Sequence, residues 1–304
     1  MKIVFFGTPD FAVASLEAIH QSGIDIVLVV TAPDKPDKRK KDVAYPTAVK
    51  TRALELGLTV SQPTSLKNKR FIHHLESIHA DLFVIVAFRM MPEIVWNMPR
   101  KGSVNLHGSL LPAYRGAAPI NWAIINGETI TGVTIFQLSH EIDTGRIIAQ
   151  KEVYIDSADD FGTLYDKMKK AGATLLVETL HHLDTNRVDF RKQDETLVSQ
   201  APKLTNENTQ IDFNRSAHEV YNFVRGLSPY PTAWCFLDEK RIKIFKCTVN
   251  NTSLAPGQWQ SDFKHFLFIG CGENSISIQE LQIEGKRKMT ITEFLNGWKN
   301  QTQR

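Results

Sequence analysis

Two hydrophobic periodicities alternate through about the first 185 residues, and this alternation constrains the fold more than any other feature. Short β-branched runs predict strands, and apolar residues three or four positions apart predict helices. The predicted strands are Ile3–Phe6, Ile26–Val30, Leu82–Val86, Val104–Leu106 and Val133–Phe136. The predicted helices are Ala12–Gln21, Pro46–Leu56, Ser65–His79, Pro119–Ile125 and Phe161–Leu183. We therefore predict an α/β fold, with a Rossmann-like, mostly parallel sheet and helices on both faces.

The chain changes character after this region. Polar residues crowd residues 187–205 and the periodicity breaks, which is typical of a linker. We accordingly predict one domain over residues 1–186, the linker, and a second domain over residues 206–304. The second domain has one predicted helix and four strand-like segments: Ala217–Leu227, then Thr232–Leu237, Ile242–Val249, Phe266–Ile269 and Ser275–Glu280. These strands fit a small β-barrel of the oligonucleotide-binding (OB-like) type, and an open sandwich accommodates them almost as well.

Charge and composition exclude several classes of protein. No run approaches the ~20 apolar residues of a membrane span, and the apolar start of the chain is too short for a signal peptide. The three cysteines lack metal-ligand spacing and are odd in number, so we expect a reducing cytoplasm. A formal charge of +3 does not identify a nucleic-acid binder by itself. Positive charge is nevertheless clustered in two places: Lys35, Lys38, Arg39, Lys40 and Lys41, and then Lys240, Arg241, Lys243, Lys246, Lys286, Arg287 and Lys288.

The segment Val104–Pro112 carries the residues best suited to chemistry. If Ser103–His107 is a buried strand, Asn105 and His107 share one face near its carboxyl end, where open parallel sheets keep their ligands. An amide donor beside an imidazole can hold a developing oxyanion and move a proton. A carboxylate such as Asp143 can orient the imidazole and stabilise its charged form. This is the apparatus of acyl transfer to an amine.

Each of these features also has a purely structural interpretation. An Asn near a turn can cap a backbone group, and a His can pack in a core. The neighbouring sequence favours a site, because Leu110-Leu111-Pro112 turns the chain and Arg115 is followed by small residues that allow close approach. The turn Gly7–Phe11 lacks the GxGxxG spacing, which disfavours NAD binding. The adjacent pairs His73-His74 and His181-His182 point in different directions on predicted helices, so we assign no metal site.

The chain resembles the methionyl-tRNA formyltransferases, within the folate-dependent formyltransferase superfamily. The resemblance covers most of the chain and rests on these segments: Phe6–Phe11, Asn105–Pro119, Asn121-Trp122, Gly127-Glu128, Thr131–Thr134, Asp143–Gly145 and Gly226–Pro231. It implies transfer of the formyl group of 10-formyltetrahydrofolate to the amine of methionyl initiator tRNA, with no metal required. The first domain would then be the formyltransferase catalytic domain and the second the tRNA-binding domain.

Site residues follow from the same resemblance. Asn105 and His107 would bind the formyl oxygen and stabilise the tetrahedral intermediate, and Asp143 would orient His107 and assist proton transfer through water. The folate would lie against Phe88, Arg89, Met90, Ser109, Leu110, Leu111, Pro112 and Ile142. Many family members have Tyr-Gly at Phe88-Arg89 and Gly at Glu141. Arg89 has three possible roles: a salt bridge to Glu141, a contact with the glutamate tail of folate, or exposure to solvent.

The basic loop, Pro33–Lys41, matches the insertion that enters the tRNA acceptor arm in this family. Lys38, Arg39, Lys40 and Lys41 would bind tRNA there, with Arg39 at the family's functional arginine, and Lys38 and Lys40 replace its usual glycines. Lys243 would contact the tRNA stem. The alternative interpretation is that Lys243 lies on an ordinary exposed strand face with no role in binding.

Two other functions compete with this one. A formyltransferase acting on a nucleotide-linked amino sugar could share the catalytic residues, but a small sugar has no need of five cations in one loop. A binding module that has lost activity would not need intact Asn105, His107 and Asp143. We thus expect a cytoplasmic, monomeric enzyme whose partners are initiator methionyl-tRNA and folate, with no membrane association.

Overall fold

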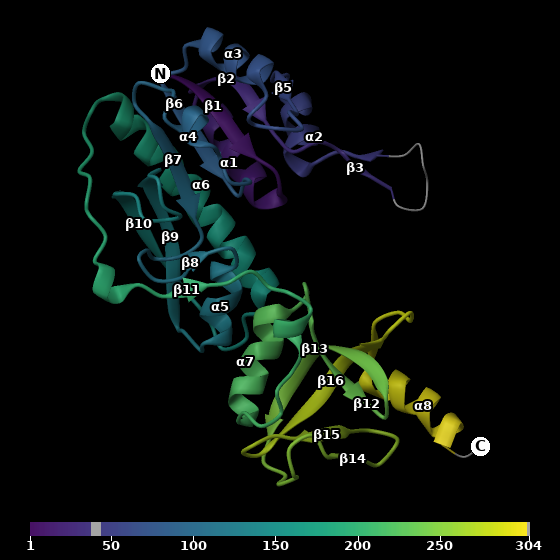
Figure 1. The fold of residues 1–304 in the computed structure, drawn as a ribbon. Helices are drawn as coiled ribbons and strands as arrows, with labels where there is room; N and C mark the ends of the chain where they lie inside the picture. Colours follow the sequence, from purple (N-terminus) through teal and green to yellow (C-terminus); the bar gives the residue numbers. More distant parts are fainter. Residues whose placement is uncertain (38–43, 303–304) are drawn as a thin grey trace. The chain divides into compact units, whose positions relative to one another are not determined.

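The computed structural model describes residues 1–37 and 44–302, with side chains described as far as Trp298. The chain forms two compact units (Figure 1). The first comprises Met1–Gly116, Gly132–Val153 and Tyr165–Gln200, and the second comprises Ala117–Thr131, Tyr154–Leu164 and Ala201–Arg304. Among the described residues, no helix has both the length and the apolar character needed to span a membrane.

The first unit is built on a seven-stranded sheet in the order β10-β9-β7-β6-β1-β2-β5. Neighbours among β1, β2, β5, β6 and β7 are parallel, and β9 runs antiparallel to β7. The sheet confirms the predicted mostly parallel architecture. Its strands are β1 (Lys2–Gly7), β2 (Asp25–Val30), β5 (Val60–Ser61), β6 (Leu82–Val86), β7 (Ser103–His107), β9 (Ile130–Gln137) and β10 (Ile147–Tyr154).

Helices cover both faces of this sheet, as predicted. On one face Phe71 and Leu75 of α3 (Lys69–Ile78) and Val95 of α4 (Glu93–Trp96) share a buried cluster with Val4 and Phe6 of β1. On the other face α6 (Phe161–Asp184) packs closely on β7, because a Cβ at Gly172 would lie 2.8 Å from the Leu106 side chain. The remaining helices of the unit are α1 (Asp10–Gln21) and α2 (Ala48–Glu55).

Two helices begin later than predicted, each directly after the residue that caps it. The helix predicted from Ser65 begins at Lys69, because the Asn68 side chain accepts hydrogen bonds from Arg70 N and Phe71 N. The helix predicted from Pro46 begins at Ala48, where Thr47 accepts from Lys50 N. Both predicted starts were too early, because the apolar periodicity begins before the point at which the backbone becomes helical.

Several short or polar elements of the first unit were not predicted. Strand β10 is half exposed and strand β5 has only two residues, so neither shows a clear alternation of apolar side chains. Helix α4 is also too short to show a period. Two small ribbons complete the set: β3 (Lys35–Pro36) with β4 (Ala44–Tyr45), and β8 (Arg115–Gly116) with β11 (Gln200–Ala201).

The second unit is built on a curled, antiparallel six-stranded sheet. The order is β12-β13-β16-β15-β14, and β17 pairs with β16. The strands are β12 (Ala233–Leu237), β13 (Lys240–Asn250), β14 (Trp259–Ser261), β15 (Leu267–Gly270), β16 (Ser275–Ile283) and β17 (Met289–Thr290). This half-barrel buries one face against α7 (Ala217–Leu227) and α8 (Ile291–Thr302).

Helix α5 (Pro119–Ile125) belongs to the core of the second unit. Its Ile125 is buried in one cluster with Val220 and Val224 of α7. The Asn121 side chain donates to the Gly226 carbonyl at 2.8 Å, and a Cβ at Gly226 would lie 2.7 Å from Ile125. A glycine is therefore required where the two helices touch.

Helix α8 was missed although its start carries a readable signal. Glu293 accepts from Thr290 N, and Thr290 Oγ1 accepts from Glu293 N, which is a capping box. Phe294, Leu295 and Trp298 then bury the apolar face of the helix. The pattern Thr-x-x-Glu followed by apolar residues would have predicted this helix. Strands β14 and β17 are too short for such a signal.

Candidate active site

Strand β7 places two polar side chains at the carboxyl edge of the sheet. Asn105 lies between Ile85 of β6 and Phe136 of β9, and His107 lies opposite Thr134 of β9. Because side chains alternate along a strand, Asn105 and His107 point to the same face. The Asn105 Oδ1 atom is buried and has no hydrogen-bond partner among the described residues. A buried amide oxygen without a partner is costly, so Asn105 is better suited to binding a ligand than to stabilising the fold.

His107 is held between a carbonyl and a carboxylate. Its Nε2 lies 2.9 Å from the Tyr114 carbonyl oxygen, and its Nδ1 lies 3.7 Å from Asp143 Oδ2. A carbonyl only accepts, so the proton of the neutral ring is assigned to Nε2 and Nδ1 keeps its lone pair. The ring is buried and meets Phe136 edge to face. Nδ1 can thus take up a proton, and the charged ring would then face Asp143.

Asp143 belongs to a tight turn, Asp143–Gly145, which we call the Asp143 turn. Its Oδ2 accepts from Gly116 N at 2.9 Å, and its backbone is left-handed, with φ of 57°. Gly145 passes against β9, where an added Cβ would lie 1.6 Å from the Gln137 carbonyl oxygen. These contacts explain why this turn ends in a glycine, since no other residue fits there.

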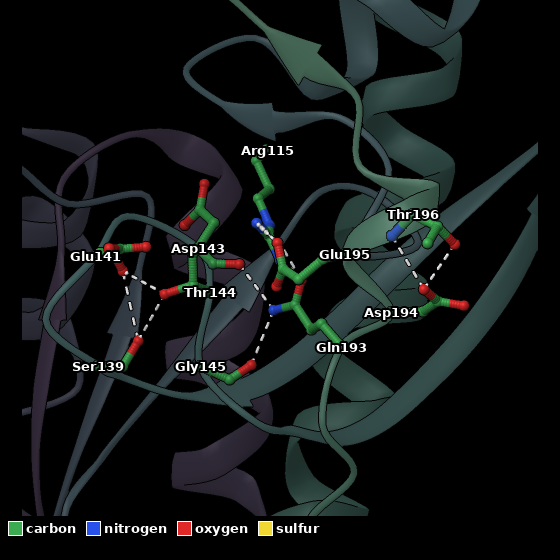
Figure 2. Close-up of polar contacts among 10 residues, drawn as sticks. All are labelled: Arg115, Ser139, Glu141, Asp143, Thr144, Gly145, Gln193, Asp194, Glu195 and Thr196. Atoms are coloured by element: carbon green, nitrogen blue, oxygen red, sulfur yellow. Dashed lines mark hydrogen bonds and ion pairs between the residues drawn. The ribbon is translucent and has the colours of Figure 1, made fainter.

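A polar network supports the turn through its backbone carbonyls (Figure 2). Gln193 Nε2 donates to the carbonyl oxygens of Asp143 and Gly145, both at 2.8 Å. Gln193 Oε1 accepts from Arg115 Nη2 at 2.7 Å and from Nε at 3.1 Å. Arg115 also makes two hydrogen bonds to the Glu195 carboxylate, which hold the pKa of Glu195 below its usual range. Residues of the predicted linker therefore reach the candidate site.

Sequence reasoning did not identify Gln193 or the Tyr114 carbonyl. Gln193 stands in a polar run, where nothing distinguishes a buried glutamine from an exposed one. A backbone carbonyl carries no signal in the residue type. The sequence placed Arg115 beside the predicted site, but its partners Gln193 and Glu195 lie about 80 residues further along the chain.

The loop after β7 is fixed by hydrogen bonds to the sheet. Ser109 is fully buried, with its hydroxyl donating to the Ala113 carbonyl and its own carbonyl accepting from Thr134. Leu111 N donates to Thr134 Oγ1, and Gln150 donates to the Leu111 carbonyl. Leu111 is buried with Phe136, while Leu110 and Pro112 are half-buried. The loop therefore offers a rigid wall beside His107.

Two loops near this wall carry exposed apolar side chains. Met90 follows β6 and is 76% exposed, and Ile142 precedes Asp143 and is 61% exposed. A contact of 3.2 Å between the Glu93 carboxylate, at the start of α4, and the His140 imidazole joins the two segments. Phe88 is half-buried against Phe6, with its ring edge-on at 5.6 Å. Exposed apolar groups on two joined loops fit a flat, largely apolar ring system such as that of folate.

Of the three roles predicted for Arg89, exposure to solvent agrees with the structure and the salt bridge to Glu141 does not. Its guanidinium donates to the carbonyl oxygens of Pro63 and Thr64 and lies 5.7 Å from the Phe88 ring centroid. Within the described part of the chain, no ion pair joins Arg89 to Glu141. The side chain is exposed, and the two backbone carbonyls fix its position at the surface. No group of three or more metal-ligating side chains is found among residues 1–37 and 44–302.

The predicted tRNA-binding residues divide into two groups. Lys38, Arg39, Lys40 and Lys41 lie outside the described residues, and only the paired strands β3 and β4 beside them are described. Lys243 is half-buried on β13, between the buried Ile242 and Ile244. Two neighbouring cations make contacts within the unit: Arg241 lies 4.0 Å from the Trp234 ring centroid, and Lys288 pairs with Glu280 at 2.7 Å.

Known protein families match both parts of this chain. Residues 1–180 match the formyl transferase family, and residues 203–299 match the formyl transferase C-terminal domain. A methionyl-tRNA formyltransferase of Parabacteroides distasonis is 46% identical, with 98% of this chain and 96% of that protein covered. One from Flavobacterium johnsoniae is 44% identical with the same coverage.

Solved structures share the fold. A sugar 3N-formyl transferase, WlaRD, crystallised with dTDP and 5-N-formyl-THF, has a TM-score of 0.69 at 22% identity, covering 94% of this chain and 99% of that one. A phosphoribosylglycinamide formyltransferase from Bacillus halodurans has a TM-score of 0.51 at 27% identity, covering 60% of this chain and 95% of that one. With two family domains and near-complete coverage by curated relatives, the chain belongs to the methionyl-tRNA formyltransferase family.

Proposed function

We propose that this protein transfers the formyl group of 10-formyltetrahydrofolate to the amino group of methionyl initiator tRNA, giving formylmethionyl-tRNA for translation initiation. The observation that carries the proposal is the placement of His107 between the Tyr114 carbonyl and Asp143, with the half-buried Asn105 on the same strand face. Curated relatives that match almost the whole chain are named methionyl-tRNA formyltransferases, which supports the identity of the acceptor.

Bound 10-formyltetrahydrofolate supplies the carbonyl carbon that the amine attacks. The Asn105 amide would donate a hydrogen bond to the formyl oxygen as negative charge develops there. His107 would take up the proton of the amine at Nδ1, while Nε2 stays bonded to the Tyr114 carbonyl. Asp143 would stabilise the charged imidazole until His107 returns the proton to the folate nitrogen, as the bond between that nitrogen and the formyl carbon breaks. The 3.7 Å between Nδ1 and the carboxylate exceeds a direct hydrogen bond, which is consistent with proton transfer through water.

We assign folate binding to the residues around these three. Met90 and Ile142 offer exposed apolar surface, and Phe88 adds an aromatic ring anchored against Phe6. Ser109, Leu110, Leu111 and Pro112 form the rigid wall beside His107, so their role is to exclude water and fix the position of the ring system. Arg89 would contribute a fixed positive charge at the edge of this surface, which suits the carboxylates of the folate tail.

We assign tRNA binding to Lys38, Arg39, Lys40 and Lys41 of the basic loop and to Lys243. Cations in such a loop would neutralise phosphates of the acceptor arm, and the binding would be strongly dependent on salt. The five cations of this loop disfavour the amino-sugar alternative, because a small sugar nucleotide does not need them. The likeness to a sugar formyltransferase at 22% identity is a likeness of fold only. We also expect the protein to act as a cytoplasmic monomer, and light scattering on the purified protein tests its mass.

The function is tested by measuring transfer of labelled formyl from 10-formyltetrahydrofolate to methionyl initiator tRNA, beside the same assay with a nucleotide-linked amino sugar. Rapid formylation of the tRNA that falls by about 100- to 1,000-fold in Asn105→Ala supports both the acceptor and the oxyanion role. Asn251→Ala, at an exposed position in the second unit, is the matched control. Activity on the sugar alone would overturn the assignment of tRNA as the acceptor. Folate binding without turnover of either substrate would overturn the proposal that the protein is an enzyme.

A further inference from the structure

Gln193 is a buried glutamine whose side chain is fully used. It is 4% exposed, its amide nitrogen donates to two carbonyl oxygens, and its amide oxygen accepts twice from Arg115 (Figure 2). A glutamine amide has two donors and two acceptor sites, so no hydrogen-bonding capacity is left over. Such complete satisfaction fixes one orientation of the side chain.

Arg115 determines which end of the Gln193 amide faces the Asp143 turn. A guanidinium only donates, so the amide oxygen must face Arg115 and the amide nitrogen must face the turn. Arg115 is itself 6% exposed and is held by two hydrogen bonds to Glu195, of 3.0 and 2.9 Å. The chain of contacts therefore runs from an exposed carboxylate through two buried side chains to the backbone of the turn.

The Asp143 turn needs this support. The left-handed backbone of Asp143, with φ of 57°, is unfavourable for a residue with a Cβ. Gln193 bonds the first and last carbonyls of the turn, while Gly116 N bonds the Asp143 carboxylate from the other side. Held at both ends, the turn presents its carboxylate to His107 at 3.7 Å.

We propose that Gln193 is a positioning residue for the formyl transfer reaction: it holds the Asp143 turn so that the carboxylate faces the His107 imidazole. This inference rests on the proposed function for its kinetic consequence, but its structural consequence does not depend on the substrate. Gln193 acts through Asp143 and does not touch the reacting groups. Loss of its amide therefore slows turnover without weakening substrate binding.

The kinetic test uses Gln193→Met, which removes all four hydrogen bonds, and Gln193→Glu, which keeps the acceptor for Arg115 but replaces the donor. A displaced catalytic group commonly costs up to about 100-fold in rate, so kcat should fall by about 10- to 100-fold with the KM of both substrates unchanged. Gln200→Met, at an exposed glutamine seven residues later, is the matched control and should behave as wild type.

A double-mutant cycle separates positioning from a general structural effect. In an Asp143→Asn background the carboxylate is absent, so Gln193→Met should reduce kcat by less than twofold further. Equal fold losses in the two backgrounds overturn the proposal, as does an unchanged kcat in Gln193→Met. Gln193→Glu guards against a folding defect, since it retains the contact with Arg115.

A second measurement needs no substrate. In protein labelled with ¹⁵N-glycine, the Gly116 amide reports its hydrogen bond to Asp143, and we expect the resonance to move in Gln193→Met in the direction in which it moves in Asp143→Asn. A Gly116 resonance that stays in place in Gln193→Met overturns the proposal. If wild-type protein formylates neither substrate while the resonance moves as expected, the proposed function fails and the positioning role stands.

Discussion

His107 Nε2 and the Tyr114 carbonyl oxygen are 2.9 Å apart, and this contact determines which ring nitrogen faces the carboxylate of Asp143. Tyr114 can present its carbonyl in this way because its own backbone is left-handed, with φ of 61°, and because its N–H is bonded to the Ser199 hydroxyl. The orientation of the imidazole is thus set by backbone geometry, and the role left to the carboxylate is to stabilise positive charge on the ring.

Replacing Asp143 by Asn should remove that response while keeping the shape of the site. The amide can still accept from Gly116 N, so we expect the turn to remain and kcat to fall by about 10²- to 10⁴-fold, the range typical of acid–base groups. Steady-state kinetics with both substrates measures the change. The same substitution at the exposed Asp189 is the control. A kcat within threefold of wild type would show that the carboxylate has no part in the reaction.

Adding one methyl group at Gly145 should displace the Asp143 turn. The new Cβ would lie 1.6 Å from the Gln137 carbonyl oxygen, so one of the two backbones must move. We expect Gly145→Ala to lower stability by about 1 to 3 kcal/mol and to reduce kcat as well. Thermal unfolding and kinetics on one preparation test both effects. Gly297→Ala adds the same methyl into open space on α8 and should not destabilise.

Lys243 should contribute to tRNA binding as a single phosphate contact. Lys243→Ala should weaken binding and reduce the slope of log affinity against log salt concentration by roughly 0.9 or less. Filter binding across a salt series measures the slope. Lys288→Ala is the comparison, because Lys288 already pairs with Glu280 and should change the slope less. Identical slopes for wild type and Lys243→Ala would show that Lys243 does not contact a tRNA phosphate.

The buried cysteines should resist alkylation in the folded protein. Burial raises the pKa of Cys235 to about 12 and that of Cys271 to about 11, above the ordinary value of 9.0. The protonated thiols therefore favour folding below pH 9, and this contribution is lost as the pH rises from 9 toward 12. Mass spectrometry after iodoacetamide treatment near neutral pH should find both thiols modified only in denaturant. Rapid labelling without denaturant would contradict their burial.

Helix α8 should lose support in acid. Hydrogen bonds from Arg287, and then from Thr290, lower the pKa of Glu293 to about 2 from 4.5. The ionised carboxylate therefore stabilises the fold above pH 4.5, and this support is lost as the pH falls from 4.5 toward 2. The difference in Tm between wild type and Glu293→Gln should shrink over that interval. Glu284→Gln, at an exposed position, should show no such trend.

The sequence allowed the architecture of the first unit to be predicted, but not all of the site. Alternation along β7 was enough to place Asn105 and His107 on one face, because a strand has a fixed period of two. Asp143 could be named as a carboxylate able to orient the imidazole, but its place beside His107 could not be predicted, since that depends on how a loop between β9 and β10 folds back. Gln193 was unpredictable, because its burial depends on Arg115, 78 residues earlier, and a polar run carries no periodic signal of that contact.

The packing of α5 on α7 has a practical consequence for dissecting the protein. A fragment that stops at residue 180, where the match to the first family domain ends, would keep α5 but remove α7 and the half-barrel. Ile125 would then face water without Val220 and Val224, and the fragment would expose apolar surface that the intact chain covers. The boundary between the family domains thus differs from the boundary between the hydrophobic cores. Exchanging domains between relatives would succeed only if α5 and α7 come from the same protein.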